Sequence, residues 1–119
     1  MCRRLIVRVS MLVCVLMPWY AGAQTEILDN VTVSRLLSQE GAFGNCMAKI
    51  DRLPQVANCP NTGWVSFSCD GTYNSAQVGN TSYGLALLAY TLGKKLTVWI
   101  DDAKLHDGFC FAWRVDIRD

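Results

Sequence analysis

The sequence predicts a small α+β domain: a mainly antiparallel sheet with one helix and two disulfides, in the element order β-β-β-α-β-β. Three observations predict it. A signal-type segment at the N-terminus leaves residues 24–119, enough for one domain. Short stretches of alternating apolar and polar residues flank a single helix-type segment. Four cysteines remain after removal of the signal, an even number that is typical of small exported domains.

Residues 1–23 have the features of a secretory signal peptide. Three arginines within the first eight residues precede an apolar run over 9–17, and Ala21-Gly22-Ala23 fits the small-x-small rule for cleavage. The apolar run is shorter than the roughly 20 residues that a membrane span needs. We therefore expect cleavage after Ala23, a secreted or periplasmic location, and no stable membrane anchor afterwards.

Cleavage changes the net charge of the chain and therefore the kinds of partner that we expect it to bind. Loss of the three signal arginines lowers the 11 basic residues to eight, against 10 acidic ones, for a net charge of about −2. No basic patch for nucleic acid remains. We expect a protein partner or a carbohydrate instead, and no cofactor.

The first half of the mature chain predicts three strands. The segment 26–39 mixes strand and helix signals, and its alternation around Val31 and Val33 favours a strand. A second short strand is expected over 45–51, followed by a loop with two prolines. Over 64–70, apolar and polar residues alternate cleanly, which is typical of a half-buried strand.

The second half predicts a helix and a hairpin. Asn80, Thr81 or Ser82 can cap a helix whose leucines follow at three- and four-residue spacing, and Gly93 ends it. No charged residue occurs between Gly71 and Gly93, so we expect this helix to be packed on most sides or to cover an interface. Two strands follow, with the inward-facing sets Leu96, Val98, Ile100 and Phe109, Phe111, Trp113, Val115, Ile117.

This element order fits a five-stranded, OB-like, partly closed barrel, and other layered α+β arrangements fit nearly as well. The stretches "NCMAKID…WVSFSCD" and "GLALLAYTLGKKLTVWID" resemble the cysteine-bearing strands and the helix–strand unit of AB5-type toxin B subunits of the subtilase-cytotoxin and typhoid-toxin type. That resemblance implies an oligomer that binds host glycans and delivers an enzymatic chain. The uncharged helix departs from the charged pore helices of those subunits. The C-terminal segment also resembles the "vdDxkxhxGxCfAxri" ending of short exported bacterial proteins, which implies no function.

The four remaining cysteines favour disulfides over a zinc site, because no CxxC pair and no histidine cluster accompanies them. The preferred pairing is Cys46–Cys59 with Cys69–Cys110, and the other two connectivities stay open. Strict alternation places Cys110 on the face opposite Phe109 and Phe111. The pairing with Cys69 therefore requires a bulge near Cys110 or a different partner.

The segment around His106, the only histidine, raises the question of catalysis. Asp101, Asp102 and Asp107 accompany it, but the spacing matches no metal loop, and Asp107-Gly108 is typical of a turn between strands. A small secreted hydrolase is one hypothesis, and it requires His106. No nucleophile motif accompanies this histidine, so we predict no catalytic and no metal-binding residues.

Three aromatic side chains are the candidates for ligand binding. Trp64 and Trp99 fall opposite the apolar faces of their strands, and Tyr73 lies in a polar loop. Such amphipathic rings are used in sugar and partner recognition, although the outer face of the sheet can also pack beneath the helix. The leading hypothesis is an exported, non-catalytic domain that binds a partner protein or a glycan. The alternatives are the B-subunit-like oligomer and the small hydrolase.

Overall fold

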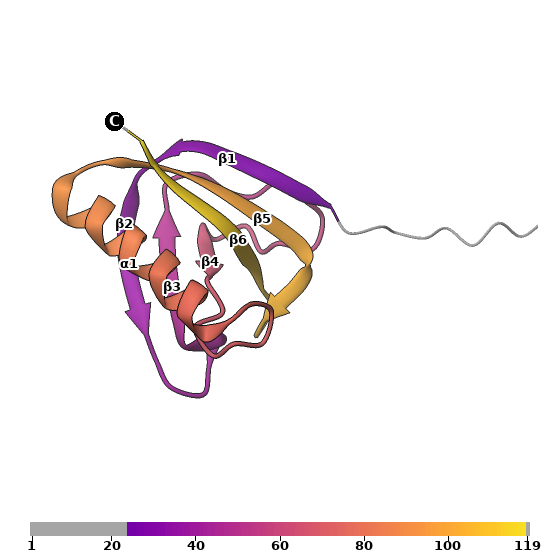
Figure 1. Cartoon of the computed structure of the whole chain (residues 1–119). Helices are drawn as coiled ribbons and strands as arrows, with labels where there is room; N and C mark the ends of the chain where they lie inside the picture. Colours follow the sequence, from indigo (N-terminus) through magenta and orange to yellow (C-terminus); the bar gives the residue numbers. More distant parts are fainter. Residues whose placement is uncertain (1–23, 119) are drawn as a thin grey trace, which may run out of the picture.

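A computed structural model describes residues 24–118, and the expected signal peptide with its cleavage site lies outside them. These residues form one sheet and one long helix (Figure 1). In chain order the elements are β1 (Thr25–Val31), β2 (Val33–Ser38), the short 3₁₀ helix η1 (Phe43–Asn45), β3 (Cys46–Ile50), β4 (Trp64–Ser66), α1 (Ala76–Leu92), β5 (Lys95–His106) and β6 (Phe109–Arg118).

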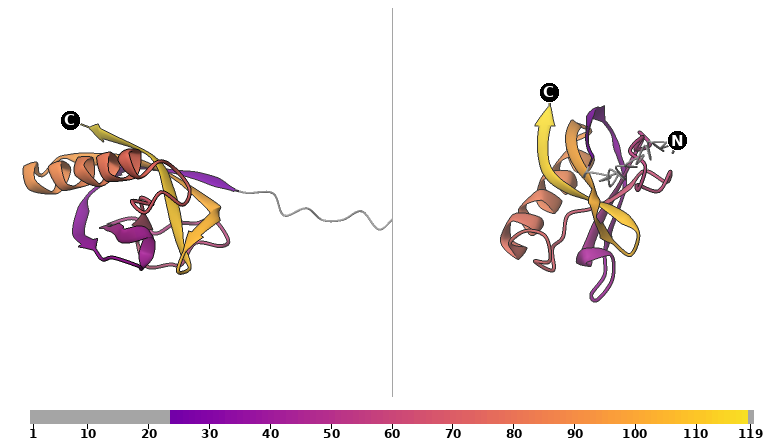
Figure 2. Two further views of the ribbon diagram at one scale, coloured as in Figure 1. Left: turned by 60° about the horizontal axis from the view of Figure 1, so that its bottom comes forward. Right: turned by 90° about the vertical axis from the view of Figure 1, so that its right-hand side faces the viewer.

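The strands follow the order β1-β5-β6-β4-β3-β2, and every pair is antiparallel except β4 with β6. The predicted α+β class is confirmed. The sheet curls, as Figure 2 shows, but its hydrogen-bonded ladder is not closed, because β1 and β2 stand at opposite ends of the order.

The first predicted strand is in fact two strands that break at Thr32. Asn30 has a left-handed φ of 57°, and after it the chain changes neighbours. Leu28 of β1 pairs with Val98 of β5, whereas Leu37 of β2 pairs with Met47 of β3. Because of this break, the single strand predicted over 26–39 forms two strands, β1 and β2, at opposite edges of the sheet. The structure therefore has six strands where five were expected.

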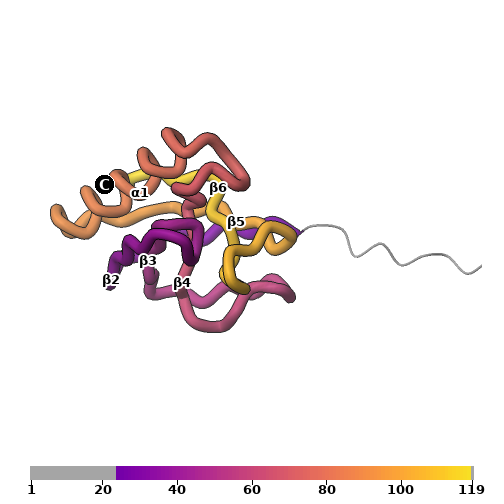
Figure 3. Tube along the Cα trace, turned by 90° about the horizontal axis from the view of Figure 1, so that it is seen from below, coloured from indigo at the N-terminus to yellow at the C-terminus, as the bar shows by residue number. Residues whose placement is uncertain are grey.

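The core lies between α1 and one face of the sheet, which we call the inner face. Figures 2 and 3 show the helix running along this side of the strands. The strands contribute fully buried aliphatic side chains from alternate positions, while α1 contributes small residues, namely Gly79, Ser82, Ala86 and Ala89. Small residues let the helix axis approach the sheet closely. The inward set Leu96, Val98 and Ile100 is confirmed.

Helix α1 begins at Ala76, four residues before the earliest predicted cap, Asn80. The Ser75 hydroxyl accepts a hydrogen bond from the Val78 amide at 3.2 Å and is the true N-cap. The first turn is poor in large apolar residues because it lies against the backbone of residues 67–69, so apolar periodicity does not mark it. At the other end Gly93 adopts φ 66° and ends the helix, as predicted.

A β-bulge in β6 overturns the predicted inward face of that strand. Trp99 of β5 pairs with Arg114, but the next residue, Ile100, pairs with Ala112, so Trp113 is an extra residue. Before the bulge Cys110 and Ala112 face the core, and after it Val115 and Ile117 do. Trp113 itself is 44% exposed.

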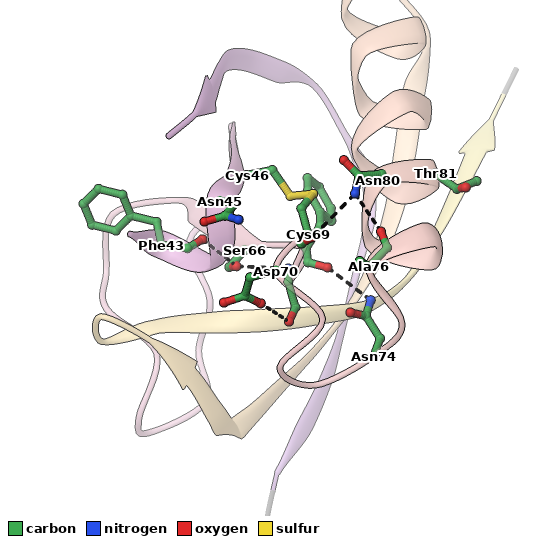
Figure 4. The surroundings of a disulfide bond; sticks show 12 residues. Phe43, Asn45, Cys46, Ser66, Cys69, Asp70, Asn74, Ala76, Asn80 and Thr81 are labelled. Carbon is green, nitrogen blue, oxygen red and sulfur yellow. Dashed lines mark hydrogen bonds between the residues drawn. A yellow bond between two sulfur atoms is a disulfide. The ribbon is translucent and has the colours of Figure 1, made fainter. Parts of the chain in front are cut away.

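The two expected disulfides are present, but their predicted pairing is wrong. Cys46 bonds to Cys69 and Cys59 bonds to Cys110, with Cα–Cα distances of 5.7 and 5.4 Å. Antiparallel pairing of β3 with β4 places the first residue of β3 beside the segment that follows β4 (Figure 4). Cys59 belongs to the loop that leaves the opposite end of β3, about 13 Å away along the strand. The Trp113 bulge turns Cys110 inward and within reach of that loop.

Candidate functional site on the outer face of the sheet

The face of the sheet that points away from α1, the outer face, carries a second apolar group. Strand register aligns Leu37, Met47, Ser66 and Phe111 in one row across β2, β3, β4 and β6. Met47, Ser66 and Phe111 are buried. Ser66 bonds the carbonyl of Phe43 in η1, and the Phe111 ring contacts that of Tyr73 in the loop before α1.

A hollow of about 170 Å³ opens at one end of this row. Its lining is mostly apolar and comes from five residues of β2, η1, β3, β4 and β6: Leu37, Phe43, Met47, Trp64 and Phe109. The rings of Phe43 and Phe109 meet edge to face, with centroids 5.7 Å apart. Four of the five lining residues belong to strands of the sheet.

The hairpin tip and η1 hold the wall of the hollow. Phe43 has a left-handed φ of 56°, which an aromatic residue adopts only when its surroundings impose it. Its amide donates a hydrogen bond to the Asp107 carboxylate at 2.7 Å. Its carbonyl accepts one from the Ser66 hydroxyl at 2.9 Å, as Figure 4 shows. The Asp107-Gly108 turn is confirmed, with φ of 50° and 88°, and Asp107 also positions Phe43.

Two basic side chains flank the hollow. Arg35, Lys49 and Trp64 are successive neighbours across β2, β3 and β4, and the Arg35 guanidinium lies 5.5 Å from the centroid of the Trp64 ring. Within residues 24–118 neither cation lies within ion-pair distance of a carboxylate. Two like charges held side by side repel each other, and an anionic group placed between them would relieve that repulsion.

Trp99 belongs to a different group, centred on β5. The Arg114 guanidinium lies 4.3 Å from the Trp99 ring centroid, and the Trp113 ring lies 6.4 Å away. Arg114 also bonds Asp116 at 3.2 Å. One face of the Trp99 ring is therefore occupied by a cation of the same chain. Beside it on β1, Ile27 is 57% exposed.

Tyr73, the third aromatic candidate, holds the fold together. Its hydroxyl donates to the Leu105 carbonyl at 2.7 Å, and its ring contacts those of His106 and Phe111 at 4.7 and 5.6 Å. The loop before α1 is thereby tied to the β5–β6 hairpin. The structure thus places Trp64, Trp99 and Tyr73 in three separate groups, and of the three Trp64 is the one that lines the hollow described above.

His106 is buried, 8% exposed, in a polar network at the same hairpin. The Ser68 hydroxyl donates to Asp70 at 3.1 Å and accepts from the Tyr73 amide at 3.0 Å, while His106 Nε2 lies 2.9 Å from the same oxygen. Because the single Ser68 hydroxyl hydrogen points to Asp70, His106 Nε2 is the donor to Ser68.

Ser68, His106 and Asp70 are of the residue types that form the catalytic triad of a serine hydrolase, but their arrangement differs from that of a triad. The Asp70 carboxylate lies 3.8 Å from His106 Nε2, the nitrogen that faces Ser68, whereas a catalytic acid holds the other ring nitrogen. Ser68 is fully buried and has a left-handed φ of 55°. The network therefore fixes a strained turn between β4 and α1, and its geometry gives the hydrolase hypothesis no support.

Burial raises the pKa of Asp70, but hydrogen bonds from Thr72 and Ser68 and the nearby His106 outweigh it, so the pKa lies below its ordinary value.

No helix within residues 24–118 is long and apolar enough to cross a membrane. In the same residues no three histidine, cysteine or acidic side chains converge as metal ligands.

Comparison of the chain with family models, with curated proteins and with solved structures finds no match. The resemblance to toxin B subunits therefore rests on the order of elements and the cysteine-bearing strands alone.

Sequence reasoning missed most residues of the hollow. The alternation of Arg35 with Leu37, and of Met47 with Lys49, indicates one face of each strand. It does not indicate that the two strands are neighbours, nor that Phe43 and Phe109 close the hollow from η1 and the hairpin.

Proposed function

We propose that this chain is an exported, non-catalytic binding domain, and that it recognises an extended segment of a protein partner at the outer-face hollow. One observation carries the proposal: a preformed apolar hollow lies beside two cations, Arg35 and Lys49, that have no carboxylate partner in the described residues. An apolar side chain fits the hollow, and an acidic neighbour fits the cations.

Two further features support a protein partner. Strand β2 stands at the end of the sheet and pairs on one side only, so its other edge has backbone groups that an extended segment can use. The two disulfides are typical of proteins that fold outside a reducing cytosol, which agrees with an exported domain.

A glycan is the second candidate, and the Trp99–Trp113 group favours it. Trp113 is 44% exposed beside the Arg114–Asp116 ion pair, which combines a ring for stacking with charged groups for hydroxyls. Because Arg114 already covers one face of Trp99, this group has less free aromatic surface than a stacking site uses. We therefore rank it second.

The test is binding of defined probes to the purified chain. Immobilised protein is screened against a displayed library of random 12-residue peptides and against a glycan array. Peptides with an aromatic or aliphatic residue next to acids should be enriched. Their affinity should fall at least tenfold in Trp64→Ala and in Arg35→Glu.

Matched controls come from the other aromatic group. Trp113→Ala and Arg114→Glu remove the same side-chain types far from the hollow, so they should leave peptide affinity unchanged. Thermal unfolding confirms that each variant is folded. Glycan binding that is lost in Trp113→Ala would select the second candidate, and peptide binding that survives in Trp64→Ala would contradict the hollow as the site.

A further inference from the structure

Helix α1 exposes an apolar surface that the sheet does not use. Five of the large hydrophobic side chains that are exposed in residues 24–118 belong to this one helix: Val78, Leu87, Leu88, Tyr90 and Leu92, each 46–59% exposed. The helix contains no charged residue. In Figure 3 α1 lies at the edge of the described part of the chain, with the strands on its other side. An exposed apolar surface of this kind marks an interaction site.

Part of this surface has the spacing of a helix-pairing seam. Val78, Thr81, Leu85, Leu88 and Leu92 follow one another at intervals of three, four, three and four residues. These are the a and d positions of consecutive heptads, and they form a single stripe along the helix. We call this stripe the heptad seam.

The heptad seam is distinct from the side of α1 that contacts the sheet. The buried positions Gly79, Ser82, Ala86 and Ala89 lie roughly 100° round the helix from it. Leu85, at the middle of the seam, contacts the core with part of its side chain and is half-buried. The sheet therefore contacts the small residues of α1 and leaves Leu87, Leu88 and Leu92 exposed.

We propose that a second copy of this chain covers the heptad seam, through an antiparallel pair of α1 helices related by a two-fold axis. The seam is uncharged along its whole length, so a copy of itself meets it without like-charge repulsion. Antiparallel packing places the positive N-terminal end of each helix dipole beside the negative C-terminal end of the other. In the register that centres the pair between Leu85 and Leu88, Leu85 lies opposite Leu88 of the second copy and Thr81 lies opposite its Leu92.

The size of the seam sets the strength of the contact. A helix of 17 residues is about 25 Å long, and one helix pair buries less than the roughly 1,600 Å² of a standard interface. We therefore expect a reversible dimer with a dissociation constant of about 10 µM. A two-fold contact closes on itself, so it yields a dimer and not the ring that the B-subunit resemblance implies. This inference does not depend on the outer-face hollow.

Sedimentation equilibrium from about 1 to 200 µM tests the proposal, with a matched pair of variants. Leu88→Lys places a charge in the heptad seam, and Leu87→Lys places the same charge on the adjacent residue outside it. The two leucines are 46% and 48% exposed, so both variants should fold equally well. We expect a dimer for the unmodified chain and for Leu87→Lys, and at least tenfold weaker association for Leu88→Lys.

A strictly monomeric mass up to 200 µM would overturn the proposal and would leave a helix of a different protein as the occupant. Equal effects of the two variants would also overturn it. Orientation is tested by mixing the Thr81→Cys and Leu92→Cys variants under oxidation. An antiparallel pair yields the mixed crosslink, whereas self-crosslinks alone contradict the two-fold arrangement.

Discussion

Replacing Gly79 by alanine tests how closely α1 lies against the segment that follows β4. Gly79 is buried in the first turn of the helix and has ordinary helical geometry, so alanine is sterically allowed by the backbone itself. An added Cβ would lie 2.6 Å from the Ser68 carbonyl oxygen and 2.7 Å from that of Phe67. Both neighbours are backbone atoms that cannot rotate away.

The magnitude follows from two opposing effects. Alanine is the better helix former by about 0.8–1 kcal/mol. The contacts at 2.6 and 2.7 Å require the helix or the segment to move by several tenths of an ångström, and overpacking of this kind costs about 1–3 kcal/mol. The upper end applies, because the Cys46–Cys69 disulfide and the Asn74 side chain fix the segment. We expect Gly79→Ala to lower the free energy of unfolding by about 2 kcal/mol.

The control is Gly84→Ala in the same helix, where nothing lies within 4 Å of the added carbon. Only the propensity effect remains there, so this variant should be more stable by up to about 1 kcal/mol. For a domain of this size the two changes correspond to a Tm about 10 °C lower and about 4 °C higher. Thermal unfolding followed by circular dichroism, with the disulfides intact, measures both.

Equal stability of the Gly79→Ala and Gly84→Ala variants would contradict this expectation. In that case the helix does not touch the carbonyls of Phe67 and Ser68, and the close approach that the small-residue side of α1 allows is absent. Since the clash is with backbone atoms, no side-chain rearrangement can rescue the prediction.

Three other outcomes are expected. Non-reducing peptide mapping should recover Cys46 linked to Cys69, and recovery of Cys46 linked to Cys59 would contradict the fold. Replacing Cys59 and Cys110 together by alanine should cost about 4 kcal/mol of unfolding free energy, against about 3.4 kcal/mol for the pair Cys46 and Cys69, because the closed loop is longer, 51 residues against 23. Asp70→Asn should lower the free energy of unfolding at pH 7. Because the pKa of Asp70 is lower in the folded state, the charged carboxylate stabilises the fold above the unfolded-state pKa of about 3.9. This stabilisation is lost as the pH falls through the folded-state pKa. Denaturant unfolding at pH 7 and at pH 2–5 checks this, and a difference that persists unchanged at pH 2 would show that the effect is not the charge of Asp70.

Local sequence features determined the elements whose signals lie within a few neighbouring residues. The apolar residues at alternate positions, Leu96, Val98 and Ile100, were enough to predict the inward face of β5. Gly93 was enough to predict the end of α1, because the left-handed backbone at that position favours glycine. The Asp107-Gly108 turn was determined in the same way. The number of disulfides in residues 24–118 also followed from the sequence, since the four cysteines there form an even set that can pair completely.

Tertiary structure alone decided what depends on neighbours distant in the chain. Cys46 pairs with Cys69 because β3 and β4 are antiparallel, and no local pattern shows which strands are neighbours. The extra residue Trp113 shifts the phase of β6, and a bulge of this kind is set by pairing with the neighbouring strand β5. For the same reason the hollow was not predictable: its walls come from five separate elements, and only the folded sheet brings them together.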